Sequence, residues 1–327
     1  MIKISAVATV LNEEASIALL LDSLLSQTKP PDEIVIVDGG SQDSTYEILK
    51  KYAEKYTFVK VMQLPGSLAE GRNAAAQEAL GDIIVQTDAG CIPNSHWIEK
   101  LTNAFSDRKT DVVAGYYDME ADSKIAQAAV PFHGVPRSQI DPRSFLPTGR
   151  SIAYKKDLFL SLGGYSTEVA RGGEDIDFDT RLLKSGANIV RAIDALVIWR
   201  VPRTFLETIK RFATYAHSDA QSGVWWHPGY KLSAQPAVAP AGAKVASLVL
   251  LPVGIVAPFS LWLFLMSFVI LSFWSIWHLR DQVYTFGARV YIPLVQVLAD
   301  ATLIVGFLYG VALRNSRKGS SSLMESV

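Results

Sequence analysis

Short apolar runs that stop abruptly at a carboxylate restrict the fold of this chain more than any other feature. Residues 83–87 run into Asp88, and residues 34–37 run into Asp38. A parallel strand that is covered on both faces has this composition, because neither face needs to be polar. The carboxyl ends of parallel strands share one edge of the sheet, where open α/β sheets bind ligands. We therefore expect Asp38 and Asp88 to meet at a binding crevice, although Asp-Ala-Gly also suits an ordinary turn.

Helical patterns separate these runs. Apolar residues recur at helical spacing in residues 17–25, and the pattern ends before Pro30 and Pro31. The alternation predicts an α/β domain with a mainly parallel, Rossmann-like sheet. A Pro-containing excursion over 118–146 is expected to be irregular or partly helical and to cover the crevice. The expected strands are 3–10, 34–37, 58–62, 83–91, 112–116, 151–154, 188–193 and 196–199, and the expected helices are 17–25, 44–54, 68–80, 97–105, 156–162 and 175–184.

Charge and cysteine content exclude some classes of protein. The 31 Lys and Arg residues nearly balance the 32 Asp and Glu residues, so nothing in the overall charge indicates a nucleic-acid partner. A single Cys cannot form an intramolecular disulfide, and it fits a reducing compartment.

The C-terminal part is much more apolar. Residues 245–277 contain no Asp, Glu, Lys or Arg, and the mean hydropathy of the whole chain is +0.20. About 20 apolar residues cross a bilayer, so this segment is long for one upright helix and short for two. We expect a helical hairpin over about 245–279, which would leave Lys244 and Arg280 on the cytoplasmic side. One long tilted helix and a buried helical region of a soluble protein are the alternatives.

A further apolar segment at about 290–313 precedes a basic tail. As a membrane span it would place that tail outside, against the positive-inside tendency, so an interfacial helix is the alternative. The sequence thus predicts a catalytic domain at 1–215, a linker or membrane-approach segment at 216–243 and a membrane region at 244–327. We expect the protein at the cell (inner or plasma) membrane, with its catalytic domain in the cytoplasm.

Carboxylates gather at strand ends and helix starts. Besides Asp38 and Asp88, they occur at Glu13-Glu14 and Glu174-Asp175. Arg72 lies within a predicted helix, and a guanidinium that faces such a crevice can clamp a diphosphate, whereas a solvated surface position is the alternative. Asp38-Gly39-Gly40-Ser41 is a poor dinucleotide turn, because no G-x-G-x-x-G follows.

Several motifs, in order, resemble the family 2 glycosyltransferases of the GT-A fold, over about residues 4–200. They are Thr9-Val10-Leu11-Asn12-Glu13-Glu14, Val35-Ile36-Val37-Asp38-Gly39-Gly40-Ser41, Gly71-Arg72-Asn73, Thr87-Asp88-Ala89-Gly90-Cys91, and Gly163-Gly164-Tyr165 through Gly173-Glu174-Asp175.

The resemblance implies a donor site. Thr9, Glu13 and Asp38 would hold the uridine or guanosine part of a nucleotide-sugar, and Arg72 would approach the diphosphate. Asp88 would stand in the D-x-D motif and bind a divalent metal, with Mg²⁺ or Mn²⁺ suited to such hard oxygen ligands. Gly90 replaces the second acid of that motif, which puts strict metal dependence in question.

The resemblance also implies an inverting reaction. Asp175, paired with Glu174, would deprotonate the acceptor hydroxyl in a single displacement, without the second catalytic carboxylate of a glycosidase. Arg150, Tyr154 and Trp199 could clamp or stack on an acceptor, as could Trp225 and Trp226. Packing or membrane-interface roles are equally compatible with these side chains.

These features together predict a membrane-bound inverting glycosyltransferase that uses a lipid-linked or polysaccharide acceptor. A polyprenyl-phosphate sugar synthase of the same fold is one alternative; its acceptor is already anionic and needs no base. An inert nucleotide-binding membrane scaffold is the other, and the missing second acid of D-x-D favours it.

Overall fold

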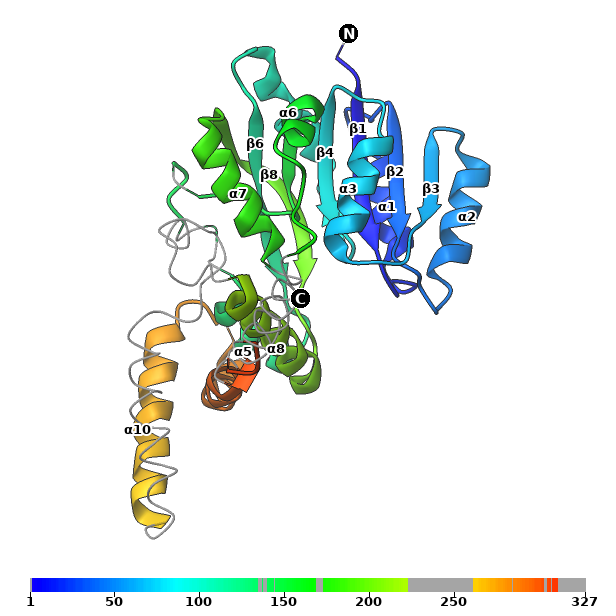
Figure 1. The fold of residues 1–327 in the computed structure, drawn as a ribbon. Coiled ribbons are helices and arrows are strands. Elements are labelled where there is room, and N and C mark those ends of the chain that lie inside the picture. Colours follow the sequence, from blue (N-terminus) through cyan, green and yellow to red (C-terminus); the bar gives the residue numbers. More distant parts are fainter. Residues whose placement is uncertain are drawn as a thin grey trace, which may run out of the picture. The chain divides into compact units, whose positions relative to one another are not determined.

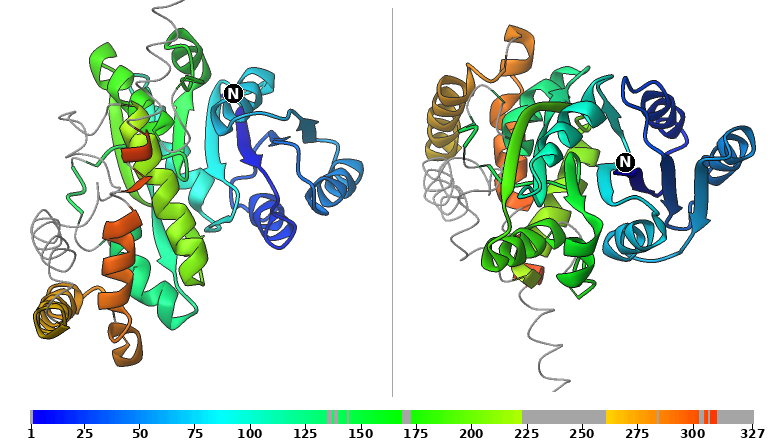
Figure 2. Two further views of the ribbon diagram at one scale, coloured as in Figure 1. Left: turned by 60° about the horizontal axis from the view of Figure 1, so that its bottom comes forward. Right: turned by 90° about the horizontal axis from the view of Figure 1, so that it is seen from above.

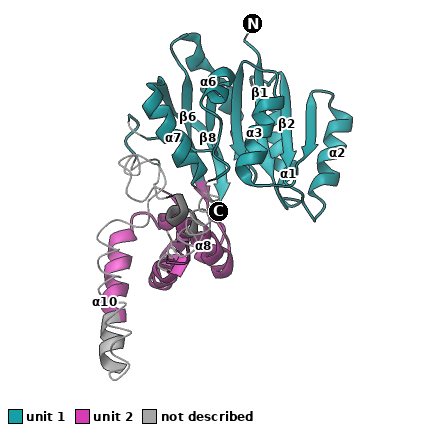
Figure 3. Cartoon of the chain, viewed as in Figure 1, with its two compact units in different colours: residues 1–118, 137–200, 228–234 teal, residues 119–136, 201–227, 235–327 magenta. Residues whose placement is uncertain are grey.

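The structure, a computed structural model, describes residues 2–134, 137, 140–143, 145–168, 173–222, 261–283, 285–302, 305, 306 and 308–310. These residues fall into two compact units (Figure 3). The first unit holds the described residues of 1–118 and 137–200, and the second holds those of 119–134 and 201–310. The predicted domain boundary at residue 215 falls within a helix of the second unit.

The first unit is built on a sheet of eight described strands in the order β3-β2-β1-β4-β7-β6-β8-β5 (Figure 1). The strands are β1 (Ile4–Val10), β2 (Glu33–Asp38), β3 (Val59–Gln63), β4 (Ile83–Asp88), β5 (Cys91–Pro93), β6 (Val112–Glu120), β7 (Ile152–Lys155) and β8 (Ile189–Arg200). The two strands expected at 188–193 and 196–199 form the single strand β8, and the short strand β5 was not expected.

The sheet is mixed, so the prediction of a mainly parallel sheet was wrong for its second half. Strand β1 pairs in parallel with β2 and β4, and β2 pairs in parallel with β3. Strand β7 runs antiparallel to both β4 and β6, and β5 runs antiparallel to β8. An apolar run shows that a strand is buried but not which way it points, and this explains the error.

Helices cover both faces of the sheet. They are α1 (Ile17–Leu25), α2 (Thr45–Lys55), α3 (Leu68–Glu78), α4 (Trp97–Thr102), α6 (Lys156–Ser161) and α7 (Glu174–Ser185). Figure 2 shows α1 and α3 on opposite faces of the parallel strands. Helices α3, α6 and α7 share one buried cluster with the sheet, in which Ala75, Phe159 and Phe178 pack against Ile84 and Tyr154.

Helix α3 is fixed tightly against the sheet. Ser67 and Glu70 form a capping box at its start, where each side chain accepts a hydrogen bond from the other residue's amide. A Cβ on Gly71 would lie 2.4 Å from the methyl group of Thr9 in β1. The absence of a side chain at Gly71 therefore permits the close approach that sets the position of Arg72.

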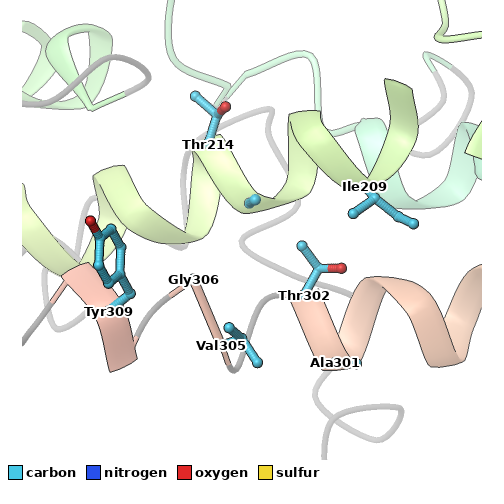
Figure 4. A pocket seen from close by; sticks show the side chains of 8 residues that line it. Ile209, Thr214, Ala301, Thr302, Val305, Gly306 and Tyr309 are labelled. Atoms are coloured by element: carbon cyan, nitrogen blue, oxygen red, sulfur yellow. The ribbon is translucent and has the colours of Figure 1, made fainter. Parts of the chain in front are cut away.

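The described part of the second unit is helical. Its helices are α5 (Lys124–His133), α8 (Phe205–Ser222), α10 (Leu261–Leu279) and α11 (Phe286–Arg289), and residues 292–302 are also helical. Helix α5 lies in the excursion that we expected to be partly helical. Helix α8 and residues 301, 302, 305, 306 and 309 line an apolar pocket of about 620 Å³ (Figure 4).

None of the helices within the described ranges is both long enough and apolar enough to cross a membrane. The predicted hairpin over 245–279 is represented by α10, which is continuous from Leu261 to Leu279. Residues 245–260 and most of the predicted linker lie outside the described residues.

Candidate active site

The strand register brings the predicted residues to one edge of the sheet. Thr9 lies between Val37 of β2 and Asp88 of β4, and Val10 lies opposite Asp38. Asp38 and Asp88 therefore end the strands on either side of β1, at the same edge of the sheet.

Arg72 lies at the centre of a cluster of carboxylates. Its Nη2 donates to Oδ1 of Asp88 at 2.5 Å, and its Nη1 donates to Oε1 of Glu174 at 3.0 Å and to Oδ1 of Asp175 at 2.8 Å. Three segments that are distant in the sequence thus meet at one guanidinium: helix α3, the end of β4 and the start of α7. We refer to Arg72, Asp88, Glu174 and Asp175 as the Arg72 cluster.

The cluster is buried on one side and accessible on the other. The side chain of Arg72 is 2% exposed, and those of Asp175 and Asp88 are 15% and 25% exposed. Burial opposes the charge of Arg72, but Asp88, Asp175 and Glu174 together raise its pKa well above the usual value. The four side chains carry a formal net charge of −2, so the accessible side favours a cation.

Asp175 is held at both oxygens. Its Oδ1 accepts from Arg72, and its Oδ2 accepts from the amide of Gly149 at 3.1 Å. A Cβ on Gly149 would lie 2.2 Å from Nη2 of Arg72, so only glycine leaves room for the guanidinium. Sequence reasoning missed Gly149; its signal was the Pro147-Thr148-Gly149 segment before Arg150.

Tyr165, which is held by Asn73 and Gln86, supports the cluster. The Arg72 guanidinium lies 5.1 Å from the centre of the Tyr165 ring. Tyr165 exchanges two backbone-to-side-chain hydrogen bonds with Asn73, each 2.8 Å long, and its hydroxyl accepts from Gln86 at 3.0 Å. Burial, followed by the charge of Asp175, raises the pKa of Tyr165 well above the usual value, so its hydroxyl stays protonated.

The side chains predicted to hold the nucleoside lie on the β1–β2 side. Asp38 is fully buried and accepts hydrogen bonds from Ser41 and from Nε2 of Gln63, the latter at 2.8 Å. Thr9 is also buried, and its hydroxyl has no hydrogen-bond partner among the described residues. An unsatisfied buried hydroxyl beside Asp88 is a polar group that a ligand could satisfy.

Glu13 approaches position 90 from the turn before α1. Its amide donates to Oγ1 of Thr45 at 2.7 Å, and its carboxylate accepts from the Ser16 hydroxyl. A Cβ on Gly90 would lie 3.8 and 3.9 Å from the two carboxylate oxygens of Glu13. Glu13 therefore places a carboxylate next to the position where the second acid of a D-x-D motif would start.

The donor set suits a divalent cation only in part. Asp88 and Glu13 offer hard oxygen atoms of the kind that Mg²⁺ and Mn²⁺ prefer. No group of three or more His, Cys, Asp or Glu residues in the described part of the chain could hold a metal by itself. Cys91 adds no soft ligand, because burial and then the charge of Asp88 raise its pKa to about 12. A bound cation would therefore need further oxygen ligands from a phosphorylated substrate.

Three of the residues suggested for the acceptor, Arg150, Tyr154 and Trp199, are buried. Tyr154 is a core residue that stacks on Phe159 and donates to Oε1 of Gln86. Its role is therefore packing. The Arg150 guanidinium lies 4.4 Å from the Trp199 ring and 4.8 Å from the Tyr117 ring. Trp225 and Trp226 lie outside the described residues.

Comparison with known proteins agrees with this geometry. Residues 5–159 match the family model for glycosyl transferase family 2. Residues 5–159 therefore form a glycosyl transferase family 2 domain. The chain is a glycosyltransferase, and its relatives carry that description: AglE of Haloferax volcanii is 24% identical over 68% of this chain and 74% of its own length.

Other similar proteins share smaller parts or only the fold. Cholesterol galactosyltransferase of Borreliella burgdorferi is 28% identical over 35% of this glycosyltransferase, and the match spans about a third (32%) of the relative. The mannosyltransferase PcManGT of Pyrobaculum calidifontis, solved with GDP-Man and Mn²⁺, superposes with a TM-score of 0.55 at 17% identity, covering 93% of this chain and 87% of that one. GalNAc-T7, solved with UDP, GalNAc and Mn²⁺, gives 0.52 at 19% identity, over 70% and 49%. These two likenesses establish the GT-A type of fold.

Proposed function

We propose that this glycosyltransferase moves a sugar from a UDP- or GDP-linked donor to a hydroxyl group of a lipid-linked or polysaccharide acceptor, with inversion at the anomeric carbon. The observation that carries the proposal is the Arg72 cluster. In this cluster Arg72 donates both to Asp88, which the family resemblance assigns to the diphosphate side of the donor site, and to Asp175, which it assigns as the base. The ligands of the similar structures, GDP-Man in one and UDP and GalNAc in the other, support a donor of this class.

Asp175 acts as the general base. Its carboxylate accepts the proton of the acceptor hydroxyl while that oxygen forms a bond to the anomeric carbon. The bond from the anomeric carbon to the diphosphate oxygen breaks in the same step, and the nucleoside diphosphate leaves with the bonding electrons. One base and one displacement give inversion, because no enzyme-bound intermediate intervenes.

The donor site combines the β1–β2 side with the end of β4. Thr9, Glu13 and Asp38 would flank the nucleoside, and the buried hydroxyl of Thr9, which has no hydrogen-bond partner among the described residues, supports a polar ligand there. A divalent cation, Mn²⁺ or Mg²⁺, would neutralise the charge that grows on the leaving diphosphate. Asp88 would hold it, with the Glu13 carboxylate beside Gly90 in place of the missing acid. The Mn²⁺ in both similar structures supports this assignment.

Exposed apolar side chains on the second unit support contact with a membrane or with a lipid-linked acceptor. Phe273, Trp277 and Phe286 are 76%, 70% and 81% exposed. The Arg280 guanidinium lies 3.9 Å from the Trp277 ring, and such an aromatic and basic pair suits a membrane–water interface. We propose an interfacial attachment at the cell membrane, with the catalytic unit in the cytoplasm. The protein should stay in the membrane pellet after a high-salt wash and leave it with detergent.

Asp175→Asn tests the reaction type. With a panel of UDP-sugars and GDP-mannose as donors, we expect the variant to lose about 10²- to 10⁴-fold in kcat. Asp177→Asn is the matched control, because Asp177 lies in the same helical turn but pairs with Arg181 at 2.6 Å. Near-normal turnover of Asp175→Asn would instead indicate a phosphate acceptor, as in a polyprenyl-phosphate sugar synthase. Nucleotide binding without any turnover by the wild type would indicate an inert scaffold.

A further inference from the structure

The Arg72 guanidinium is buried and faces carboxylates of the protein. Its side chain is 2% exposed, and both of its terminal nitrogens donate to carboxylates of the protein. Its Nε is buried and has no hydrogen-bond partner among the described residues. A diphosphate clamp needs the guanidinium edge directed at the ligand, with donors open to it. The observed geometry leaves no such edge.

The contacts of Arg72 instead join the two reacting sides of the proposed site. Nη2 holds Asp88 on the donor side, and Nη1 holds Asp175 on the acceptor side. The planar fork fixes the angle between these two hydrogen bonds, which an ammonium group on a flexible stem would not. Glu174 also accepts from Nη1 and is 4% exposed, so it anchors the guanidinium from within the protein.

The surrounding backbone is shaped for this arrangement. Gly149 leaves space for Nη2 and also donates its amide to Oδ2 of Asp175. Gly71 brings α3 close enough to β1 for Arg72 to reach the cluster, and the Tyr165 ring lies next to the guanidinium. These contacts fix the arginine and the base together rather than either one alone.

We propose that Arg72 is a positioning residue that holds the base Asp175 at a fixed place relative to Asp88, and that it does not bind the donor diphosphate. The inference rests on the proposed function, because it assigns the base role to Asp175. In catalysis, a small displacement of a base from its acceptor costs a large factor in rate, while the binding of the donor is left largely intact.

Arg72→Lys separates positioning from diphosphate binding. Lysine keeps the positive charge and one donor direction but lacks the fork. We expect kcat to fall by about 10²-fold, whereas the dissociation constants of UDP and GDP, measured by calorimetric titration with Mn²⁺, change by less than about threefold. A rise of the nucleotide dissociation constant in proportion to the loss of activity would overturn the inference. Arg181→Lys, in α7 but paired with Asp177, is the control.

Gly149→Ala provides a second test that keeps every charge. The added methyl group would lie 2.2 Å from Nη2, so it must displace the guanidinium. We expect the same pattern, a lower kcat with unchanged nucleotide binding, in a protein whose thermal unfolding remains cooperative. A normal kcat in folded Gly149→Ala would contradict the proposal.

A double-mutant cycle completes the test. If Arg72 acts through Asp175, the loss in kcat for Arg72→Lys with Asp175→Asn should be close to that of Asp175→Asn alone, because residues that act as a unit are not additive. If the double variant instead loses the product of the two single kcat losses, Arg72 acts independently of Asp175. Failure of the proposed function looks different: the wild type would then bind neither UDP nor GDP, or Asp175→Asn would turn over normally.

Discussion

The two compact units differ in the side chains that they bury and expose. The first unit encloses Arg72 together with the carboxylates of Glu174, Asp175 and Asp88. The second unit leaves Phe273, Trp277 and Phe286 more than two-thirds exposed. Buried charges are costly unless they are paired, and large apolar side chains on the surface indicate an interaction site. The first arrangement therefore points to chemistry, and the second to contact with an apolar partner.

A large effect is expected at the donor side of the Arg72 cluster. Asp88→Asn keeps the shape of the side chain but removes a negative charge from both Arg72 and the cation. We expect a loss of about 10²- to 10³-fold in kcat, which is typical of a removed electrostatic contact to a leaving group. The measurement is transfer rate against Mn²⁺ concentration. Asp82→Asn is the control, because Asp82 precedes the other end of β4 and accepts from the Lys3 amide. Full activity of Asp88→Asn with metal chelated would disprove the metal role of Asp88.

A smaller effect, on stability, is expected where α3 meets the sheet. Gly71→Ala forces a methyl group to within 2.4 Å of the Thr9 methyl group in a close-packed contact. We expect the free energy of unfolding to fall by about 1–3 kcal/mol, the usual cost of overpacking. Urea unfolding of the variant, compared with Gln77→Ala on the exposed face of the same helix, measures this. An unchanged unfolding midpoint would show that α3 can move away from β1 without cost.

The parallel half of the sheet could be predicted from the sequence because local signals agree there. Each strand of this half is a short apolar run, and in β2 and β4 the run stops at Asp38 and Asp88. The direction of β7 and the union of residues 189–200 into one strand could not be predicted, since they depend on which strands become neighbours. That choice is made by packing over long sequence distances, which no local pattern records.

The candidate site, like the sheet, could be predicted from the sequence only in part. The placement of Asp38 and Asp88 at one edge of the sheet followed from topology alone. The inward direction of Arg72 did not, because a helical position facing the sheet edge leaves a long side chain several directions. The need for glycine at position 149 could not be predicted for the same reason, because it depends on the position of Nη2 of Arg72. Tyr154 and Trp199 were ambiguous between acceptor contact and packing, and only burial separates these roles.

A pH effect follows from a buried carboxyl group one turn beyond the base. Burial, and then the charge of Asp175, raises the pKa of Asp179 well above its usual value of 3.8. The folded state therefore holds this proton more tightly than the unfolded state does, and stability falls as pH rises above about 4. One such proton contributes at most about 1.4 kcal/mol per pH unit. Asp179→Asn should remove this loss, so its melting temperature should exceed that of the wild type more at pH 8 than at pH 5. The same difference in melting temperature between the two proteins at pH 5 and at pH 8 would contradict the raised pKa of Asp179.

The smallest effect on stability, and the sharpest contrast with the first unit, is expected for the exposed apolar side chains of the second unit. Phe273→Ser with Trp277→Ser removes side chains that are 76% and 70% exposed, so the unfolding free energy should change by no more than about 0.5 kcal/mol. Binding to anionic vesicles, measured by flotation, should nevertheless fall several-fold, because the lost area is the part that a bilayer would cover. Leu80→Ser in the first unit, where Leu80 is 69% exposed, is the matched control and should leave flotation unchanged. Equal flotation of all three proteins would mean that exposed apolar side chains on this unit serve something other than a lipid surface.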